Sequence, residues 1–264
     1  MQRQTSITGP STENYTQNSG LTVNSGTGNI SISAALGENK ALAQINLNSD
    51  TATFDSMTST GDILIETLTG NIVVPQSLTT SSNSANAIVI NAGKNSNAGD
   101  ASGGNIIISG SPNLTVGNGG LIKLYSGGIS QSTGLVGYVG NGSDNFRYNS
   151  DEQTTNYTLN LSPNVPNAIY RQKVNLSVSV NNKTITYGDA TPTFTTTING
   201  LVNGDTLNDV VGNDTINMSN YNVGSRPINT AGTTDRLGYS LNYQPGLFTV
   251  NTKTVSLAVA PKVY

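Results

Sequence analysis

The stretch "GDILIETLTGNIVVP" (residues 61–75) carries the pattern that decides the fold of this chain. Within it, Gly followed by Asp or Asn twice opens a run of β-branched residues. Gly, Asn and Asp suit tight turns, whereas Ile and Val suit strands. The same phrase occurs as GNISIS at 28–33 and GNIIIS at 104–109, and strand-like alternation fills 43–54 and 86–93. The first half of the chain is therefore predicted to be a succession of short strands and short polar turns.

Two architectures fit such a succession, a β-sandwich and a parallel β-helix. The recurring Gly-Asn/Asp-Ile turn favours a right-handed parallel β-helix, in which each coil stacks on the last and like residues form ladders, including Asn ladders at turns. No helical stripe of apolar residues interrupts the pattern. The phrase recurs at uneven intervals, whereas tandem coils should recur more evenly, so the sandwich stays open as an alternative.

Composition excludes several classes of function. Only 10% of the 264 residues are charged, against roughly 25% in an ordinary soluble domain. The lack of Cys and His excludes disulfides, thiolate catalysis, the usual zinc ligands and any catalytic triad built on His. The net charge of -3 gives no basic face, so nucleic acid is not an expected partner. We expect no cofactor, no bound metal and no enzymatic activity.

The first residues of the given sequence are not expected to form a signal peptide. The first ten residues lack the apolar segment of a signal peptide, and no apolar stretch approaches the roughly 18 residues of a membrane span, so membrane insertion is not expected. The last residues, "KTVSLAVAPKVY" (253–264), read as a strand over Val255–Ala260. We expect this to be the first strand of a following, truncated repeat, in a chain cut from a longer protein.

The second half begins on a strict alternation that predicts a strand with one buried face. Its apolar positions are Val174, Leu176, Val178 and Val180. Further strands are expected within 193–201, 222–232 and 242–251, and a single short helical turn within 203–212. Together they predict a compact unit over residues 173–252.

This unit closely resembles the MBG ("mostly beta-grasp") domain, which occurs in tandem in very large bacterial surface proteins. The matching segments fall in the order Tyr187-Gly188-Asp189, Gly200-Leu201, Asn203-Gly204-Asp205 and Gly246-Leu247-Phe248-Thr249-Val250. The Gly-rich stretch from residue 117 to 172 resembles the segment that precedes MBG domains in filamentous-haemagglutinin-like exoproteins, and the strands before it resemble their β-helical shaft.

The resemblance implies an all-β chain of four parts. These are a β-helix shaft at 1–140, a cap or connector at 141–172, a β-grasp-like MBG domain at 173–252 and the truncated repeat at 253–264. It also implies a large adhesin that is exported unfolded through an outer-membrane partner by two-partner secretion. Such a protein would lie at the bacterial cell surface or be secreted, and it would attach to a host-cell or matrix receptor, glycan or protein, or act in a biofilm.

Three aspartates near the Gly-Asp pairs are candidate calcium ligands, namely Asp189, Asp205 and Asp209. Their spacing matches neither an EF-hand loop nor a calcium-binding β-roll. We interpret them as turn and cap residues, with Asp205 placed as the N-cap of the short helical turn. The only adjacent acidic pair in the sequence is Asp151 and Glu152, which is not spaced for glycosidase chemistry. We expect Arg147 to pair with one of these acids at the junction.

Two other functions stay open as alternatives. Tyr221, Tyr239 and Tyr243 cluster late in the second unit, and exposed aromatic rings there would give a carbohydrate-binding module. A β-helix can also be a polysaccharide lyase, which needs carboxylate-bound calcium and a basic residue in a groove. The shaft has few of either, with Lys94 and Lys123 as its main central cations.

Overall fold

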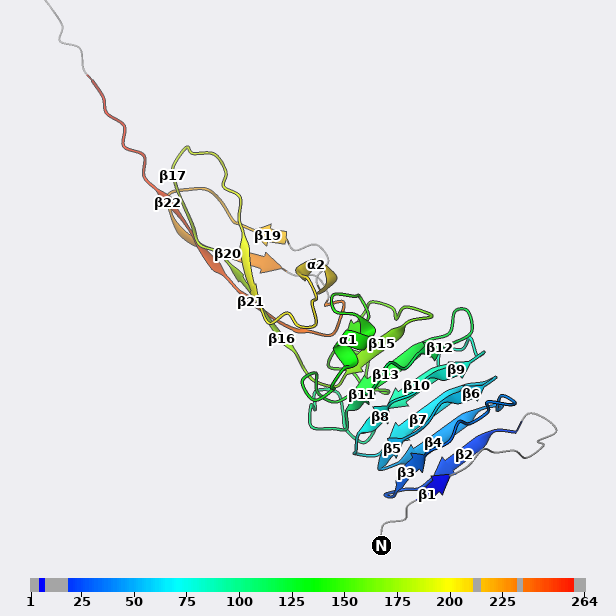
Figure 1. Ribbon diagram of the computed structural model, residues 1–264. Coiled ribbons are helices and arrows are strands. Elements are labelled where there is room, and N and C mark those ends of the chain that lie inside the picture. The colour runs from blue at the N-terminus through cyan, green and yellow to red at the C-terminus, as the bar shows by residue number, and fades with distance from the viewer. Residues whose placement is uncertain (1–4, 8–18, 211–214, 232–234, 259–264) are drawn as a thin grey trace, which may run out of the picture.

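The computed structural model describes residues 5–7, 19–210, 215–231 and 235–258, and shows two modules that follow one another along one long axis (Figure 1). The first is a β-helix, which we define as residues 5–7 and 19–170. The second is the C-terminal module, residues 175–251. The chain between them is short, because the last strand of the β-helix ends at Tyr170 and the next begins at Asn175.

Three parallel sheets form the β-helix, so the predicted architecture is confirmed and the β-sandwich is wrong. Sheet A contains β1 (Thr5–Ile7), β3 (Asn29–Ile32), β5 (Thr51–Thr53), β8 (Ile72–Val74) and β11 (Ile106–Ile108). Sheet B contains β2 (Leu21–Asn24), β4 (Ile45–Ser49), β7 (Ile63–Thr67), β10 (Ile88–Asn91), β13 (Ile122–Ser126), β15 (Pro166–Tyr170) and β14 (Phe146–Arg147). Sheet C contains β6 (Met57–Ser59), β9 (Leu78–Thr80) and β12 (Leu114–Thr115).

The uneven spacing of the Gly-Asn/Asp-Ile phrase has a simple structural reason. Its copies at 28–33, 70–75 and 104–109 open strands of sheet A, whereas the copy at 61–66 opens β7 of sheet B. One coil can therefore contain the phrase twice, once on each sheet. The phrase marks a type of turn, and it does not mark the coil period.

The core of the β-helix is built from ladders of identical or similar side chains. In sheet B, parallel pairing places Ile45, Ile63, Ile88 and Ile122 opposite one another on successive coils, and each is at most 1% exposed. β-Branched side chains at these inward positions pack well on a pleated surface. Each coil thus buries its apolar row against the coils before and after it, as in other solenoids.

The turns between sheets B and A stack so closely that only Gly fits. A Cβ added to Gly104 would lie 2.0 Å from the carbonyl oxygen of Gly70, and one on Gly70 would lie 2.3 Å from the carbonyl oxygen of Asp50. Beside them, Asn71 Oδ1 accepts a hydrogen bond from the Asn105 backbone N–H at 2.8 Å. Asn thus occupies the same turn position in these two coils, and the hydrogen bond between the two residues runs from backbone to side chain.

The coil stack continues beyond residue 140, where the sequence predicted its end. After the short helix α1 (Leu135–Val139), β14 and β15 return to sheet B, and β15 pairs in parallel with β13. The Gly-rich composition that suggested a cap reflects turns within this last part of the stack. The segment from 141 to 172 therefore contributes strands to the shaft as well as connecting it to the C-terminal module.

The C-terminal module packs two small sheets, and it is β-grasp-like as predicted. One sheet has the order β18-β16-β21, formed by β16 (Asn175–Val180), β18 (Thr196–Asn199) and β21 (Ser240–Gln244). The other has the order β17-β22-β20-β19, formed by β17 (Lys183–Thr186), β19 (Thr215–Asn217), β20 (Gly224–Ala231) and β22 (Gly246–Asn251). The predicted helical turn is α2 (Leu207–Val210).

The strand expected at Val255–Ala260 is not formed over the part that the structure describes. Residues 252–258 have no regular secondary structure, and Val255 and Leu257 are 79% and 86% exposed. A strand needs a neighbour for its backbone hydrogen bonds, and none is paired with these residues within the described chain. The remaining residues of the expected repeat, 259–264, lie outside the described residues. In the described parts of the chain, neither helix has the length or apolar character needed to cross a membrane.

The stacked glycines give a first prediction. Gly104→Ala should lower the free energy of unfolding by about 1–3 kcal/mol, because its methyl group would meet backbone atoms that cannot rotate away. Urea unfolding followed by circular dichroism measures this change. Gly137→Ala is the matched control, since its Cβ would have no atom within 4 Å, and it should leave the midpoint unchanged or slightly higher. Equal stability of the two variants would contradict close stacking.

Candidate functional site at the junction of the two modules

A buried carboxylate links the two modules at their junction through hydrogen bonds. Asp205 Oδ2 accepts hydrogen bonds from the Tyr148 hydroxyl, at 2.7 Å, and from the Tyr239 hydroxyl, at 2.7 Å. Asn203 Nδ2 donates to the Tyr148 hydroxyl oxygen at 3.0 Å. Tyr148 follows β14 of the β-helix, whereas the other three residues belong to the C-terminal module. We call these four residues the Asp205 cluster.

Asp205 therefore has a different role from the one predicted. It is 7% exposed and does not cap the short helix α2. That position is taken by Thr206, whose hydroxyl donates to Asp209 Oδ2 at 2.7 Å, while the same oxygen accepts the Thr206 backbone N–H. The interpretation of Asp209 as a cap residue is thus correct, and Asp205 instead joins two segments that lie far apart in sequence.

A column of aromatic rings runs through the junction. Phe146 and Tyr170 are stacked with centroids 6.4 Å apart, and Tyr170 and Tyr148 with centroids 6.1 Å apart. Tyr148 then meets Tyr239 at 4.7 Å. All four rings are at most 4% exposed. Each such pair contributes about 0.5–1.5 kcal/mol beyond its buried area, so the column ties the last coil to the C-terminal module.

The backbones of the two modules also touch directly. The Tyr148 backbone N–H donates to the Leu237 carbonyl oxygen at 2.9 Å, and the Gly142 N–H to the Asn203 carbonyl oxygen at 2.8 Å. Gly238 has φ +99°, and a Cβ there would lie 2.1 Å from the carbonyl oxygen of Tyr148. A side chain at this position would separate the two modules.

Arg147 is completely buried, yet it does not pair with Asp151 or Glu152 as predicted. Its guanidinium donates to the carbonyl oxygens of Asp144, Phe146, Leu159 and Asn160 at 2.6–3.1 Å. It also lies 5.3 Å from the centroid of the Tyr157 ring. Burial lowers the pKa of Arg147, and nearby phenolic and carboxyl groups oppose that effect. Four backbone carbonyl oxygens, in place of the expected carboxylate, thus accept the hydrogen bonds of the Arg147 guanidinium.

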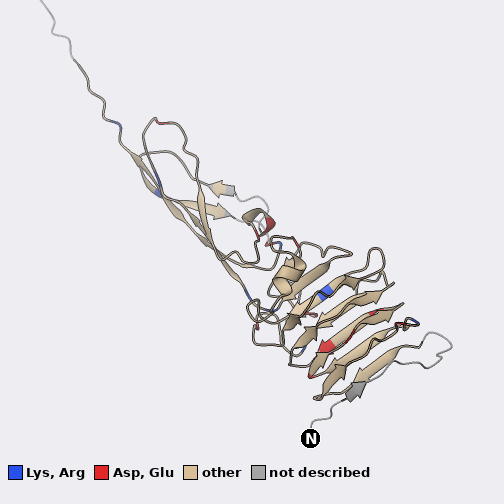
Figure 2. Ribbon diagram, in the orientation of Figure 1, with Lys and Arg blue, Asp and Glu red and all other residues tan. Residues whose placement is uncertain are grey.

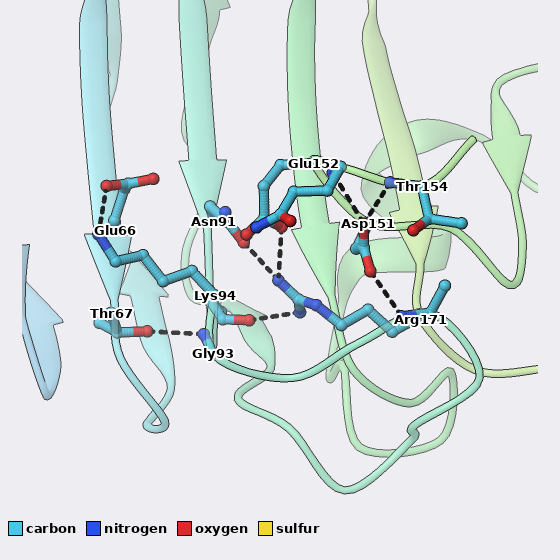
Figure 3. Close-up of polar contacts among 12 residues, drawn as sticks. Glu66, Thr67, Asn91, Gly93, Lys94, Asp151, Glu152, Thr154 and Arg171 are labelled. Carbon is cyan, nitrogen blue, oxygen red and sulfur yellow. Dashed lines mark hydrogen bonds and ion pairs between the residues drawn. The ribbon is translucent and has the colours of Figure 1, made fainter.

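The acids expected to meet Arg147 lie instead around Arg171, in the linker between the modules (Figure 3). Glu152 Oε2 lies 3.7 Å from Arg171 Nη2. Arg171 Nη1 donates to the Ala92 carbonyl oxygen at 2.6 Å, and Nη2 donates to Asn91 Oδ1. The guanidinium of Arg171 therefore joins the linker to β10 and to the loop that carries Glu152.

Asp151 organises that loop through backbone hydrogen bonds. Its carboxylate accepts the backbone N–H groups of Ala98, Gln153 and Thr154 (Figure 3 shows the Thr154 contact). Burial raises the pKa of Asp151, but these donors outweigh burial and hold it below its usual range. Asp151 and Glu152 are not arranged as a pair of catalytic carboxylates. Asp151 accepts backbone N–H groups of its own loop and of Ala98, and Glu152 lies beside Arg171.

The predicted tyrosine cluster does not form one surface. Tyr239 is 4% exposed and belongs to the Asp205 cluster, so its ring cannot stack on a sugar. Tyr243 is half-buried and packs against the core. Tyr221 is 43% exposed and packs edge-on against Phe248 at 5.7 Å, in the second small core of the C-terminal module. Of the three candidates, only Tyr221 keeps an exposed ring.

The other candidate residues also have local partners. Asp189 Oδ2 accepts the Thr186 backbone N–H at 2.8 Å, as expected of a turn aspartate. Lys94 Nζ lies 2.9 Å from Glu66 Oε2 (Figure 3), and Lys123 Nζ donates to Asn86 Oδ1 at 3.0 Å. Within the described parts of the chain, no three acidic side chains are grouped so as to hold a metal ion.

The residues that sequence reasoning missed are Tyr148, Tyr170 and Arg171. A partial signal exists, because Phe146 and Tyr148 alternate as inward residues of one strand would. Their partners lie in other parts of the chain, so the sequence offers no local mark of the Asp205 cluster.

The two Gly-Asp pairs give a second prediction. Asp205→Ala should cost about 2–4 kcal/mol of unfolding free energy, because it leaves two buried tyrosine hydroxyls without their acceptor. Asp189→Ala, which removes an exposed turn contact, should cost about 0.5–1 kcal/mol. Chemical denaturation of both variants measures the difference, and equal losses would mean that the Asp205 cluster does not hold the junction.

Asp235, beside the junction, gives a prediction for the pH dependence of stability. Burial raises the pKa of Asp235 from 3.8 to about 6, although backbone N–H donors oppose the rise. A folded-state pKa above the unfolded value gives stability that is fully present below pH 3.8 and is lost as the pH rises through 6. Asp235→Asn should flatten the fall in stability between pH 4 and pH 6, measured by unfolding across that range. An unchanged slope would contradict the raised pKa.

Comparison with known proteins identifies the C-terminal module. Residues 176–249 match the family model of the MBG domain (YGX type), and Tyr187-Gly188-Asp189 has the Tyr-Gly-x form of that description. Searches of curated proteins and of solved structures returned no match. The resemblance predicted for this part of the chain is confirmed, whereas the assignment to filamentous-haemagglutinin-like exoproteins stays a prediction. Residues 176–249 are thus an MBG domain joined to the end of a parallel β-helix.

Proposed function

We propose that this chain is a non-enzymatic, load-carrying part of a large bacterial surface adhesin, in which the β-helix is a shaft and the MBG domain a spacer. The two modules would hold a binding surface away from the cell. Support comes from the match to the MBG domain, a non-catalytic family found in adhesin-like surface proteins. A coil stack also suits the task, because it grows in length without needing a larger core.

The observation that carries the proposal is the continuity of the core across the junction. One hydrophobic cluster extends from Ile30 in the β-helix to Leu176 and Tyr239 in the MBG domain. Interfaces between domains are otherwise small and polar, and relative motion is the default expectation. A spacer that must project a binding surface needs a joint that does not bend, and a shared core with the Asp205 cluster beside it supplies one.

The proposal extends to export and to attachment. We propose secretion through an outer-membrane partner by the two-partner route, with attachment to a host-cell or matrix receptor or a role in a biofilm. The lack of Cys supports this route, since no disulfide can form before the chain crosses a membrane unfolded.

A rigid joint can be tested by its response to an inserted linker. Insertion of the four residues Gly-Ser-Gly-Ser between Gln172 and Lys173 should uncouple the two modules. The backbone at this point is bonded to the last coil, since the Gln172 N–H donates to the Gly127 carbonyl oxygen at 3.0 Å. Small-angle X-ray scattering should show one narrow distribution of lengths for the unaltered chain and a broad one for the insertion variant.

The control carries the same insertion at Gly119, an exposed turn where an added Cβ would meet no atom within 4 Å. It should keep the narrow length distribution. A broad distribution for the unaltered chain would refute the rigid spacer.

A further inference from the structure

A groove crosses the outer face of sheet B, on the side opposite to the core. It has a volume of about 410 Å³, within the range of small-ligand sites. Its floor is one outward row of side chains placed in register on four successive coils: Asn46, Leu64, Val89 and Lys123. We call it the sheet B groove. Since strands lie about 4.8 Å apart, the four floor strands span about 14 Å along the shaft.

Two walls give the groove its depth. Gln44, Asp62 and Asn86, each just before a strand of sheet B, form the first wall. Tyr125 and Glu152 form the second. Glu152 comes from the loop over the last coils, where Tyr157 and Leu161 pack on the outward side chains of Val89, Tyr125 and Ile169.

Two polar side chains of the first wall, Asp62 and Asn86, have hydrogen-bond partners within the protein before any ligand arrives. Asp62 Oδ1 accepts hydrogen bonds from the hydroxyls of Ser82 and Ser84, at 2.5 and 2.8 Å. Asn86 Oδ1 accepts one from Lys123 Nζ at 3.0 Å, which fixes the ammonium group over the floor. Preorganised groups lose little conformational freedom on binding, so such a wall favours affinity.

The lining narrows the chemistry of the occupant. It combines three amides, two carboxylates, one ammonium group and the Tyr125 phenol with the aliphatic side chains of Ile45, Leu64 and Val89. The two carboxylates outnumber the single ammonium, and charged residues are scattered along the whole molecule (Figure 2), which disfavours a polyanion. A peptide could not add as a strand, because the groove lies on the face of sheet B and the backbone groups beneath it are already paired.

We propose that the sheet B groove binds an extended, uncharged glycan chain that lies along the shaft. Lys123, Asn86 and Asp62 would hydrogen bond its hydroxyl groups, and the half-buried Leu64 would contact the C–H faces of its rings. The inference rests on the proposed exposure of the shaft at the cell surface, and it gives the shaft a binding role of its own beside its mechanical one.

The test uses the whole chain and named probes. Isothermal titration calorimetry with linear neutral hexasaccharides of glucose and of N-acetylglucosamine, in several linkages, should give saturable binding of at least one. Lys123→Ala and Asn86→Ala should each weaken the affinity for the hexasaccharide about tenfold, because each removes about one hydrogen bond to the glycan. Asn86 is exposed, so its replacement leaves the fold intact, which circular dichroism checks.

The matched controls are Lys183→Ala on β17 and Asn83→Ala in the turn that carries Asn86, neither of which lines the groove. Both should bind as the unaltered chain does. Absence of binding to every neutral hexasaccharide, equal loss in variants and controls, or preference for heparin would overturn the proposal. So would release of unsaturated products from polygalacturonate, which would assign lyase chemistry instead.

The outcome is independent of the test of the rigid joint. A groove that binds no glycan leaves the scattering result for the spacer unchanged. A flexible joint would in turn leave glycan binding unchanged, because every residue of the groove belongs to the β-helix or to the loop that packs on it.

Discussion

Parallel pairing between successive coils satisfies the backbone of the β-helix, and the rest of the structure depends on it. Each strand has neighbours on both sides except where the stack ends, and an open end presents unpaired N–H and C=O groups to other chains. At the C-terminal end, loops of the MBG domain accept backbone N–H groups of the connector, among them those of Gly142, Tyr148 and Thr158. The MBG domain therefore closes the stack as well as extending it.

This dependence explains why the junction holds so many buried polar groups. Arg147 and Arg171 are fully buried. Arg147 donates to four backbone carbonyl oxygens, whereas Arg171 donates to the Ala92 carbonyl oxygen and to Asn91 Oδ1 and lies beside Glu152. A buried charge is costly unless its hydrogen bonds are satisfied, and all three guanidinium nitrogens of Arg147 donate to carbonyl oxygens. Both guanidinium groups therefore hold loops of the last coils, next to the point at which the chain leaves the shaft.

The fold was predictable from the sequence because its signal is local. A Gly-Asn turn followed by Ile residues forms the same unit wherever it occurs, and strict alternation from Val174 to Val180 predicts β16. The junction was not predictable, because its residues are defined by distant partners. Gly188-Asp189 and Gly204-Asp205 look alike in sequence, and their distant partners Tyr148 and Tyr239 make the second one a buried site. Similarly, nothing local distinguishes Arg147 from Arg171 as the partner of Glu152.

The turns of the β-helix differ widely in length while the core register stays constant. Between sheets B and A, one turn covers residues 68–71 and the next 92–105, yet Ile72 still pairs with Ile106 and Ile63 with Ile88. A loop on this flank can therefore lengthen without moving any residue of the core. Insertions in loops add little to the entropic cost of folding. In such a shaft, the outer surface is free to diversify in evolution while the inner ladders remain under constraint.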